Sequence, residues 1–301
     1  MVRSSGRVRR GLSMMWPAAA ALLGIGACGT PDPPPQDPPA SPFKSAIDLA
    51  PMLPPSADVV GVAVAPEGQR YVLDRNSGLY EIDAAGARSI FSTSDMAYAI
   101  SLSAVGELTD VVALGSERFA ITAVNDGYML DLHNETLTSY FCYLPALPDP
   151  NGDPGGGSVV PPSVSQTLRS QGIEVEERTE SVAFSPDNLL LYAQPQTIRV
   201  DTGQVMGSEL FVFSDGGGQP IQVQGMPSPS FIAGGMVAVD RGARLLLGIR
   251  NEIFALDPGT GPTRIRQFDP SIDISGLALD TNGDLLVLDR AGRRLLTTSL
   301  Y

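Results

Sequence analysis

Apolar and polar positions beyond residue 43 follow the pattern of short β-strands. Short apolar runs rich in Val, Ile, Leu and Tyr alternate with turns that contain Gly, Pro, Asn and Asp. Such runs are typical of strands, and no segment in this region keeps a helical period over about 12 residues. We therefore expect an all-β domain over residues 44–301.

The strand pattern repeats along the chain. Val59–Gly86 and Asp273–Leu300 both contain an apolar strand, a turn with Gly, a second strand that ends Val-Leu-Asp-Arg, another turn and a third strand. Related units begin near residues 110, 181 and 236. The first strands of the five units are expected at Val60–Val64, Asp110–Leu114, Ser181–Phe184, Met236–Val239 and Ser275–Leu279.

Repeated groups of three or four short strands predict a β-propeller. One small sheet cannot bury both of its faces, whereas sheets stacked in a ring bury each other. Five blades are recognisable, and six are possible because a divergent blade could lie between the second and third units. The last unit ends after three strands, so we expect Ser45–Leu49 to supply its fourth strand and close the ring.

One segment interrupts the repeat. Residues 144–171 are rich in Pro, Gly and Ser and lack the strand pattern. A loop of this length in a compact domain is typically functional or disordered. We expect an insertion that projects from one face of the propeller.

Residues 1–27 have the pattern of a secretory signal peptide. Four arginines precede an apolar run over Met14–Ala27, which is shorter than the roughly 20 residues of a membrane-spanning helix. The sequence Ile25-Gly26-Ala27-Cys28 resembles the bacterial lipobox, which implies that Cys28 is acylated and becomes the first residue of the mature protein. Two alternatives stay open: an ordinary signal peptide with a chance cysteine, and a twin-arginine signal at Arg9-Arg10.

Residues 28–43 form a proline-rich linker. Proline lacks the N–H group needed for helices and sheet ladders, so an extended spacer of roughly 3.1 Å per residue is expected. Such a spacer would hold the folded domain away from a membrane. With the lipobox resemblance and Gly29 after Cys28, we expect a lipid-anchored protein of the cell envelope, on the periplasmic side of the outer membrane.

The charge balance argues against nucleic acid as a partner. The chain has 20 basic and 33 acidic residues; without the four arginines of the signal peptide 16 basic residues remain, and the net charge is −17. Such a surface repels phosphate backbones and anionic lipids. Cys142 is the only cysteine besides Cys28, so no internal disulfide framework is expected.

Sequence motifs in three units point to known propeller families. The last unit contains Gly276-Leu277-Ala278-Leu279-Asp280, then Gly283, then Leu286-Val287-Leu288-Asp289, and the first unit is similar to it. These two units resemble the NHL and gluconolactonase/regucalcin-like propellers, which usually have six blades. The run VAFSPD, which begins after Ser181, is equally similar to a TolB-type and a WD-type blade. The resemblance implies a fold rather than a function.

Two carboxylates are candidates for a metal site at the mouth of the central channel. With the units aligned on the core of their first strands, Asp110 and Glu180 take corresponding positions on neighbouring units. Paired carboxylates can bind a hard divalent cation such as calcium, or raise each other's pKa. The regucalcin-like hydrolases place Glu, Asn and Asp ligands at such positions, which implies Glu180 and Asp110 as ligands; no asparagine takes an equivalent place here. Solvated acids or turn caps are the alternative.

Other acidic residues indicate structural roles. Asp149–Asp153 begins like a calcium loop but is followed by Pro154 in place of glycine, so a plain turn is expected. Asp74 and Asp289 are each followed by arginine, and we expect both to cap the turn at the end of their strand.

Together these features favour a membrane-anchored, extracytoplasmic lipoprotein that acts as a non-enzymatic binding module. Its partners would be the membrane, through the acyl anchor, and a protein or small molecule at the propeller face; we expect a monomer. The first alternative is a metal-dependent lactone or ester hydrolase of the gluconolactonase/regucalcin type. The second is a TolB-like envelope assembly scaffold, which would have a stable protein partner.

Overall fold

The computed structural model describes most of the chain beyond residue 41. The described residues are 42–95, 107–123, 126–142, 163–184, 191–208, 210–214, 217–221, 235–240, 242, 244–257 and 261–300. They belong to one compact unit, Ser41–Tyr301. The predicted signal peptide, Cys28 and nearly all of the predicted linker lie outside the described residues and stay predictions.

The described strands form five antiparallel sheets, which we number along the chain. Sheets 1 and 2 each run in chain order from the inner to the outer strand. Sheet 1 consists of β2 (Val59–Val64), β3 (Arg70–Asp74), β4 (Gly78–Asp83) and β5 (Gly86–Ser92). Sheet 2 consists of β6 (Leu108–Ala113), β7 (Arg118–Ala123), β8 (Asp126–Asp131) and β9 (Thr136–Cys142).

Sheets 3 and 4 keep the same order, and sheet 3 has one additional strand. Sheet 3 consists of β10 (Val175–Phe184), β11 (Leu191–Arg199), β13 (Leu210–Ser214) and β14 (Gly217–Ile221), with β12 (Val205–Ser208) paired to the far end of β11. Sheet 4 consists of β15 (Gly235–Val239), β16 (Leu245–Ile249), β17 (Glu252–Asp257) and β18 (Gly261–Gln267).

Sheet 5 joins the two ends of the domain. It consists of β19 (Ile274–Leu279), β20 (Leu285–Asp289), β21 (Arg294–Thr298) and β1 (Ser45–Asp48). The strand β1 pairs antiparallel with β21, from Ser45 opposite Thr297 to Asp48 opposite Arg294. The predicted closing strand is therefore confirmed.

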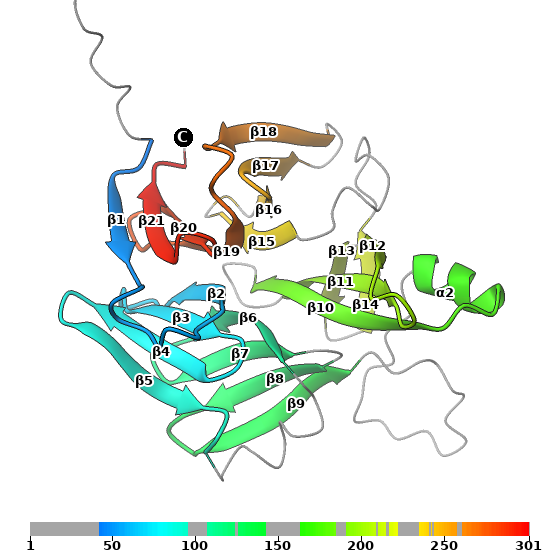
Figure 1. Cartoon of the computed structure of the whole chain (residues 1–301), viewed down its shortest axis with the longest axis horizontal. Coiled ribbons are helices and arrows are strands. Elements are labelled where there is room, and N and C mark those ends of the chain that lie inside the picture. The colour runs from blue at the N-terminus through cyan, green and yellow to red at the C-terminus, as the bar shows by residue number, and fades with distance from the viewer. Residues whose placement is uncertain are drawn as a thin grey trace, which may run out of the picture. The chain divides into compact units, whose positions relative to one another are not determined.

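The inner strands of the five sheets follow one another around a common centre (Figure 1). β2 contacts β6, β6 contacts β10, β10 contacts β15, β15 contacts β19, and β19 returns to β2. Small antiparallel sheets arranged in this way form a β-propeller, as the repeats predict. The described residues supply five blades. The choice between five and six for the whole chain stays a prediction, because residues 144–162 of the insertion lie outside the described part.

In the described part of the chain, four interfaces between neighbouring sheets bury apolar side chains from both: sheets 1 and 2, 3 and 4, 4 and 5, and 5 and 1. Between sheets 1 and 2, the rings of Tyr71 and Phe119 meet edge to face with centroids 4.8 Å apart. Leu49, which follows β1, is fully buried in the cluster between sheets 5 and 1. Stacking thus buries the apolar faces that no single sheet could cover.

Two inner-strand glycines allow neighbouring sheets to approach closely. A Cβ on Gly276 would lie 3.0 Å from the backbone nitrogen of Val62, and one on Gly61 would lie 3.0 Å from that of Val111. We expect Gly276→Ala to lower the free energy of unfolding by about 1–3 kcal/mol, because backbone atoms must move apart. Gly115→Ala is the matched control, since its Cβ would meet nothing within 4 Å. Urea denaturation measures both, and equal values for the two variants would contradict close packing at Gly276.

A short helix, α2 (Ser163–Ser170), lies within the predicted insertion. Its end is fixed by Gly172, with φ of 75°, and by a hydrogen bond of 3.0 Å from the Ile173 N–H to the Leu168 carbonyl oxygen. This is a glycine-terminated helix end of the Schellman type. The sequence does not predict this helix, because eight residues are too few for a clear helical period. Residues 144–162 of the insertion lie outside the described part.

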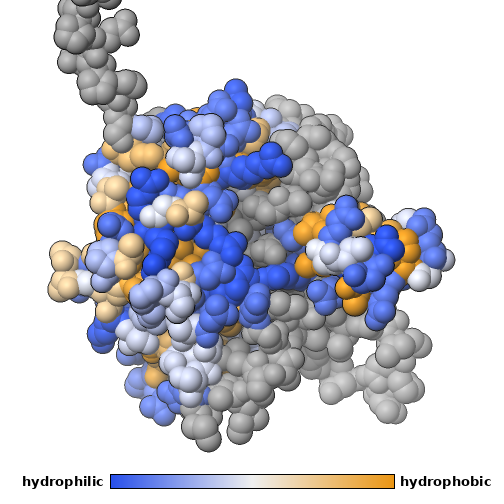
Figure 2. Space-filling model, viewed as in Figure 1, coloured by the Kyte–Doolittle hydropathy of each residue, from blue (hydrophilic) through white to orange (hydrophobic). Residues whose placement is uncertain are grey.

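The helix belongs to an arm that extends from sheet 3 (Figure 1). α2 contacts β10 and β12. β10 and β11 extend beyond the rest of sheet 3, and α2 and β12 lie at this extended end, away from the other sheets. Apolar atoms gather on this arm (Figure 2), where Val200, just after β11, is 47% exposed.

Candidate functional site at the central channel

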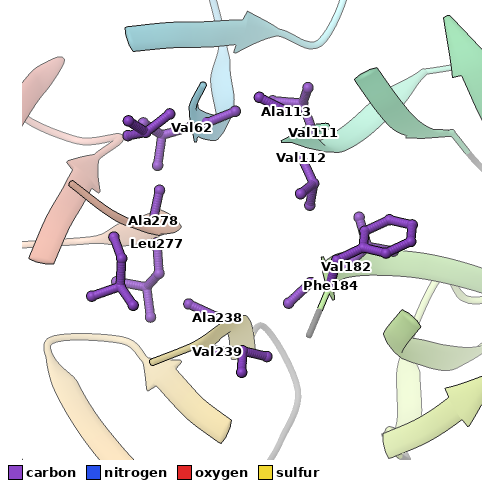
Figure 3. Close-up of a pocket in the computed structure, with 14 residues that line it drawn as sticks. Val62, Val111, Val112, Ala113, Val182, Phe184, Ala238, Val239, Leu277 and Ala278 are labelled. Carbon is purple, nitrogen blue, oxygen red and sulfur yellow. The ribbon is translucent and has the colours of Figure 1, made fainter. Parts of the chain in front are cut away.

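The inner strands surround a cavity of about 170 Å³ at the centre of the ring. Each strand contributes two or three consecutive residues: Val62–Val64, Val111–Ala113, Val182–Phe184, Ala238–Val239 and Leu277–Leu279. Figure 3 shows these side chains arranged around one open centre. Every described lining residue is Val, Ala, Leu or Phe, so the described part of the wall has no charged, acid–base or nucleophilic side chain.

The backbone makes this wall partly polar. Each inner strand is the last strand of its sheet, so its inner edge pairs with no further strand of that sheet. The N–H and C=O groups on this edge lie outside the hydrogen-bond ladder of their own sheet. The cavity therefore combines apolar side chains with neutral hydrogen-bonding groups.

Asp110 lies beside the apolar wall, where it joins sheets 2 and 3. Its Oδ2 accepts hydrogen bonds from the Ser181 hydroxyl at 2.7 Å and the Val182 N–H at 2.9 Å. Its Oδ1 accepts one from the Val111 N–H at 2.8 Å. The residue is only 4% exposed, and a buried carboxylate needs such donors to offset its lost hydration. We interpret Asp110 as a structural bridge between the two sheets.

β-bulges shift the register at the start of four inner strands. In β6 the shift lies between Leu108 and Asp110, and in β10 between Thr179 and Ser181. Asp110 is therefore equivalent to Ser181, and the residue equivalent to Glu180 is Thr109. The alignment of the units was therefore wrong by one residue in the second unit. It was based on the alanine of each first strand, and Ala113 lies one position further from the bulge than the alanines of the other three bulged strands do.

The predicted metal site stays a prediction. Asp110 hydrogen-bonds to the two residues that follow Glu180, so the structure brings the two segments together. The side chain of Glu180 lies outside the described part. Among the described residues, no group of three or more His, Cys, Asp or Glu could hold a metal ion.

An ion-pair ladder follows the rim of the channel, where the inner strands begin. Arg290 of sheet 5 donates to both carboxylate oxygens of Asp58 at 2.6 Å, and Arg75 donates to Asp58 at 2.9 Å. Glu107, just before β6, accepts from Arg75 at 3.2 Å and from Arg178 of β10 at 3.4 Å. The ladder thus links sheets 5, 1, 2 and 3, and its charges are paired with one another.

Turn caps hold Asp58 in place. Asp74 accepts hydrogen bonds through Oδ1 from the N–H groups of Asp58 at 3.0 Å and Asn76 at 3.3 Å. Asp289 makes the corresponding bonds to the N–H groups of Asp273 and Gly292. The predicted capping role of Asp74 and Asp289 is confirmed. The sequence did not reveal that each cap also reaches back to the residue before the inner strand.

Asp58 should make stability depend on pH. Partial burial tends to raise the pKa of Asp58, but hydrogen bonds and charge from Arg290 and Arg75 outweigh it, so the pKa lies below its ordinary value of 3.8. A lowered folded pKa adds stability above pH 3.8 that is lost as pH falls through the folded value. We expect Asp58→Asn to cost about 1 kcal/mol at pH 7, after allowance for solvent screening, and less than that at pH ~2. Urea denaturation at both pH values tests this, and a pH-independent difference would contradict it.

Comparison with known proteins adds likenesses of fold. No protein-family model and no curated protein sequence matches the chain. Among solved structures, a luciferin-regenerating enzyme is 13% identical, with a TM-score of 0.49 over 85% of this chain and 76% of that one. Regucalcin, a calcium-binding protein from Agrobacterium tumefaciens, is 11% identical, with a TM-score of 0.45 over 76% and 66%.

A third likeness is to part of a longer protein. The extracellular domain of a protein assigned as a hybrid two-component system from B. thetaiotaomicron is 15% identical, with a TM-score of 0.43 over 84% of this chain. This chain spans only 39% of that domain's length. The propeller assignment itself rests on the sheet order and strand contacts. Among the described residues, no helix is long and apolar enough to cross a membrane.

Proposed function

We propose that the protein is a lipid-anchored, extracytoplasmic β-propeller that binds a ligand at its central channel without catalysing a reaction. The carrying observation is the channel wall, whose lining side chains are all Val, Ala, Leu or Phe. Acid–base and nucleophilic catalysis require a positioned side chain within reach of the substrate. A wall without such side chains suits binding.

The state of Asp110 supports binding over metal-dependent hydrolysis. Its two oxygens accept three hydrogen bonds from buried donors of sheets 2 and 3. A metal ion at this carboxylate would compete with those donors. The carboxylate would then have to exchange structural bonds for metal bonds.

The binding assignment is tested by comparing the wild-type chain with Asp110→Asn and Glu180→Gln in thermal melts with Ca²⁺, Zn²⁺ and Mn²⁺. A ligand at a hundred times its dissociation constant stabilises the folded state by roughly 2.7 kcal/mol. We expect the metal ions to cause no rise in the wild-type melting temperature that is absent from both variants. We also expect no turnover of lactones or aryl esters. A metal-dependent rise in the melting temperature that both variants lose, together with turnover of a lactone or ester by the wild-type chain, would establish the hydrolase instead.

The anchor proposal is supported by the sequence of residues 1–43, in which Cys28 follows a short apolar run and precedes the proline-rich linker. We expect the wild-type protein to incorporate a labelled fatty acid and to sediment with membranes. Cys28→Ser should remove the label and release the protein from the membrane fraction. Membrane association unchanged by Cys28→Ser would refute the anchor.

A further inference from the structure

We propose that the central cavity binds a small uncharged molecule built on an apolar group of about the size of benzene. The inference rests on the proposed function and names the class of ligand. It follows from three properties of the cavity: the absence of charge in its wall, its volume, and the polar edges of its inner strands.

The wall selects against charged ligands. None of the lining side chains that the structure describes carries a charge, so an ion among them would lose hydration without gaining an opposite charge. An anion would also approach Asp110, whose carboxylate adjoins the lining residue Val111. Neutral molecules avoid both costs.

The volume sets the size of the ligand. Apolar cavities of about 150 Å³ lined by Leu, Ile and Phe bind benzene in engineered proteins. The present cavity, at about 170 Å³, has similar room, and its described side chains are likewise apolar, although most of them are Val and Ala. A six-membered ring or a branched chain of six carbons therefore matches it.

The strand edges add a preference for one neutral polar group. Backbone N–H and C=O groups on the inner edges of strands such as β2 and β19 have no partner strand in their own sheet. A hydroxyl on the ligand can hydrogen-bond to such a group, whereas benzene cannot. Phenol should therefore bind more tightly than benzene.

The test uses the full chain with four probes that share one ring: benzene, phenol, benzoate and benzamide. Benzamide is neutral and has nearly the shape of benzoate, so it separates the effect of charge from that of size. Binding is measured by ligand-detected NMR and by calorimetry. We expect a dissociation constant on the order of 1 mM for phenol, which is typical of ligands with so few atoms. Benzoate should bind at least tenfold more weakly. Benzoate binding as tight as phenol, or no binding of either benzene or phenol, would overturn the proposal.

Cavity-filling variants locate the binding. Ala278→Leu adds three carbons at the wall and should weaken phenol at least tenfold, whereas Ala84→Leu adds them at an exposed position and should leave binding unchanged. Ala113→Val makes a smaller change in the wall and decides the question if Ala278→Leu fails to fold. Phenol binding unchanged in a folded wall variant would place the probe elsewhere and refute the proposal.

The outcomes separate this inference from the proposed function. Lactone and ester turnover report on the non-enzymatic assignment and do not depend on the probes. If neither benzene nor phenol binds, the proposed ligand class is wrong and the non-enzymatic assignment is unaffected. If the protein hydrolyses a lactone or ester and also binds phenol, the non-enzymatic assignment is wrong, and the cavity is still the site for a neutral group.

Discussion

Replacing Asp110 with alanine should lower the free energy of unfolding by about 3 kcal/mol in buffer that contains EDTA. The change removes the acceptor for the Ser181 hydroxyl and the N–H groups of Val182 and Val111. Each buried donor left without a partner costs about 1–3 kcal/mol. We expect the loss of unfolding free energy to stay at the lower end of the summed cost of the three donors, because the sheets can adjust and water can enter at the rim. Urea denaturation of the full chain measures it.

Two further variants show whether burial produces the effect. Asp83→Ala removes a carboxylate that caps an exposed turn through the N–H groups of Ala85 and Gly86, and it should cost no more than about 1 kcal/mol. Asp110→Asn keeps one oxygen acceptor, so its loss of unfolding free energy should lie between those of Asp110→Ala and Asp83→Ala. If Asp110→Ala equals wild type in EDTA and differs only when a divalent cation is present, Asp110 is a metal ligand and the bridge interpretation is wrong.

The sequence identified Asp110 but not its partners. Alternating apolar residues and turn residues indicate strands, and that part of the prediction holds for sheet 2. The β-bulge before Asp110 adds a residue that no local pattern marks. Because a shift by one residue turns a side chain to the other face of a strand, the alignment placed Asp110 beside the wrong equivalents.

Long-range contacts at the rim were also beyond sequence reasoning. Arg290 and Asp58 are 232 residues apart and meet only because sheet 5 closes against sheet 1. Closure itself was predictable, since the last unit lacked a strand and Ser45–Leu49 could supply it. The sequence thus predicts the order of the sheets better than the side-chain contacts between them.

Removal of residues 42–49 should destabilise the propeller by at least about 3 kcal/mol. Leu49 is fully buried, and the loss of a buried leucine side chain alone typically costs 2–5 kcal/mol. The backbone would lose further bonds, including Lys44 N–H to the Thr297 oxygen at 2.7 Å and Leu49 N–H to the Arg293 oxygen at 2.9 Å. Without β1, the strand β21 becomes an open edge that other chains can pair with. A chain of residues 50–301 should therefore unfold at lower urea and associate at high concentration.

A peptide of residues 42–49 added in trans should restore much of the stability, because it can pair with β21 in the same register as β1. The matched peptide with Leu49→Asp keeps the backbone groups but would bury a charge, so it should restore far less. Rescue by the first peptide alone would show that closure depends on the leucine as well as on the strand. If residues 50–301 unfold at the same urea concentration as the intact chain, the N-terminal strand is an accessory. The contacts of β19 and β20 with β2 would then hold the ring closed without it.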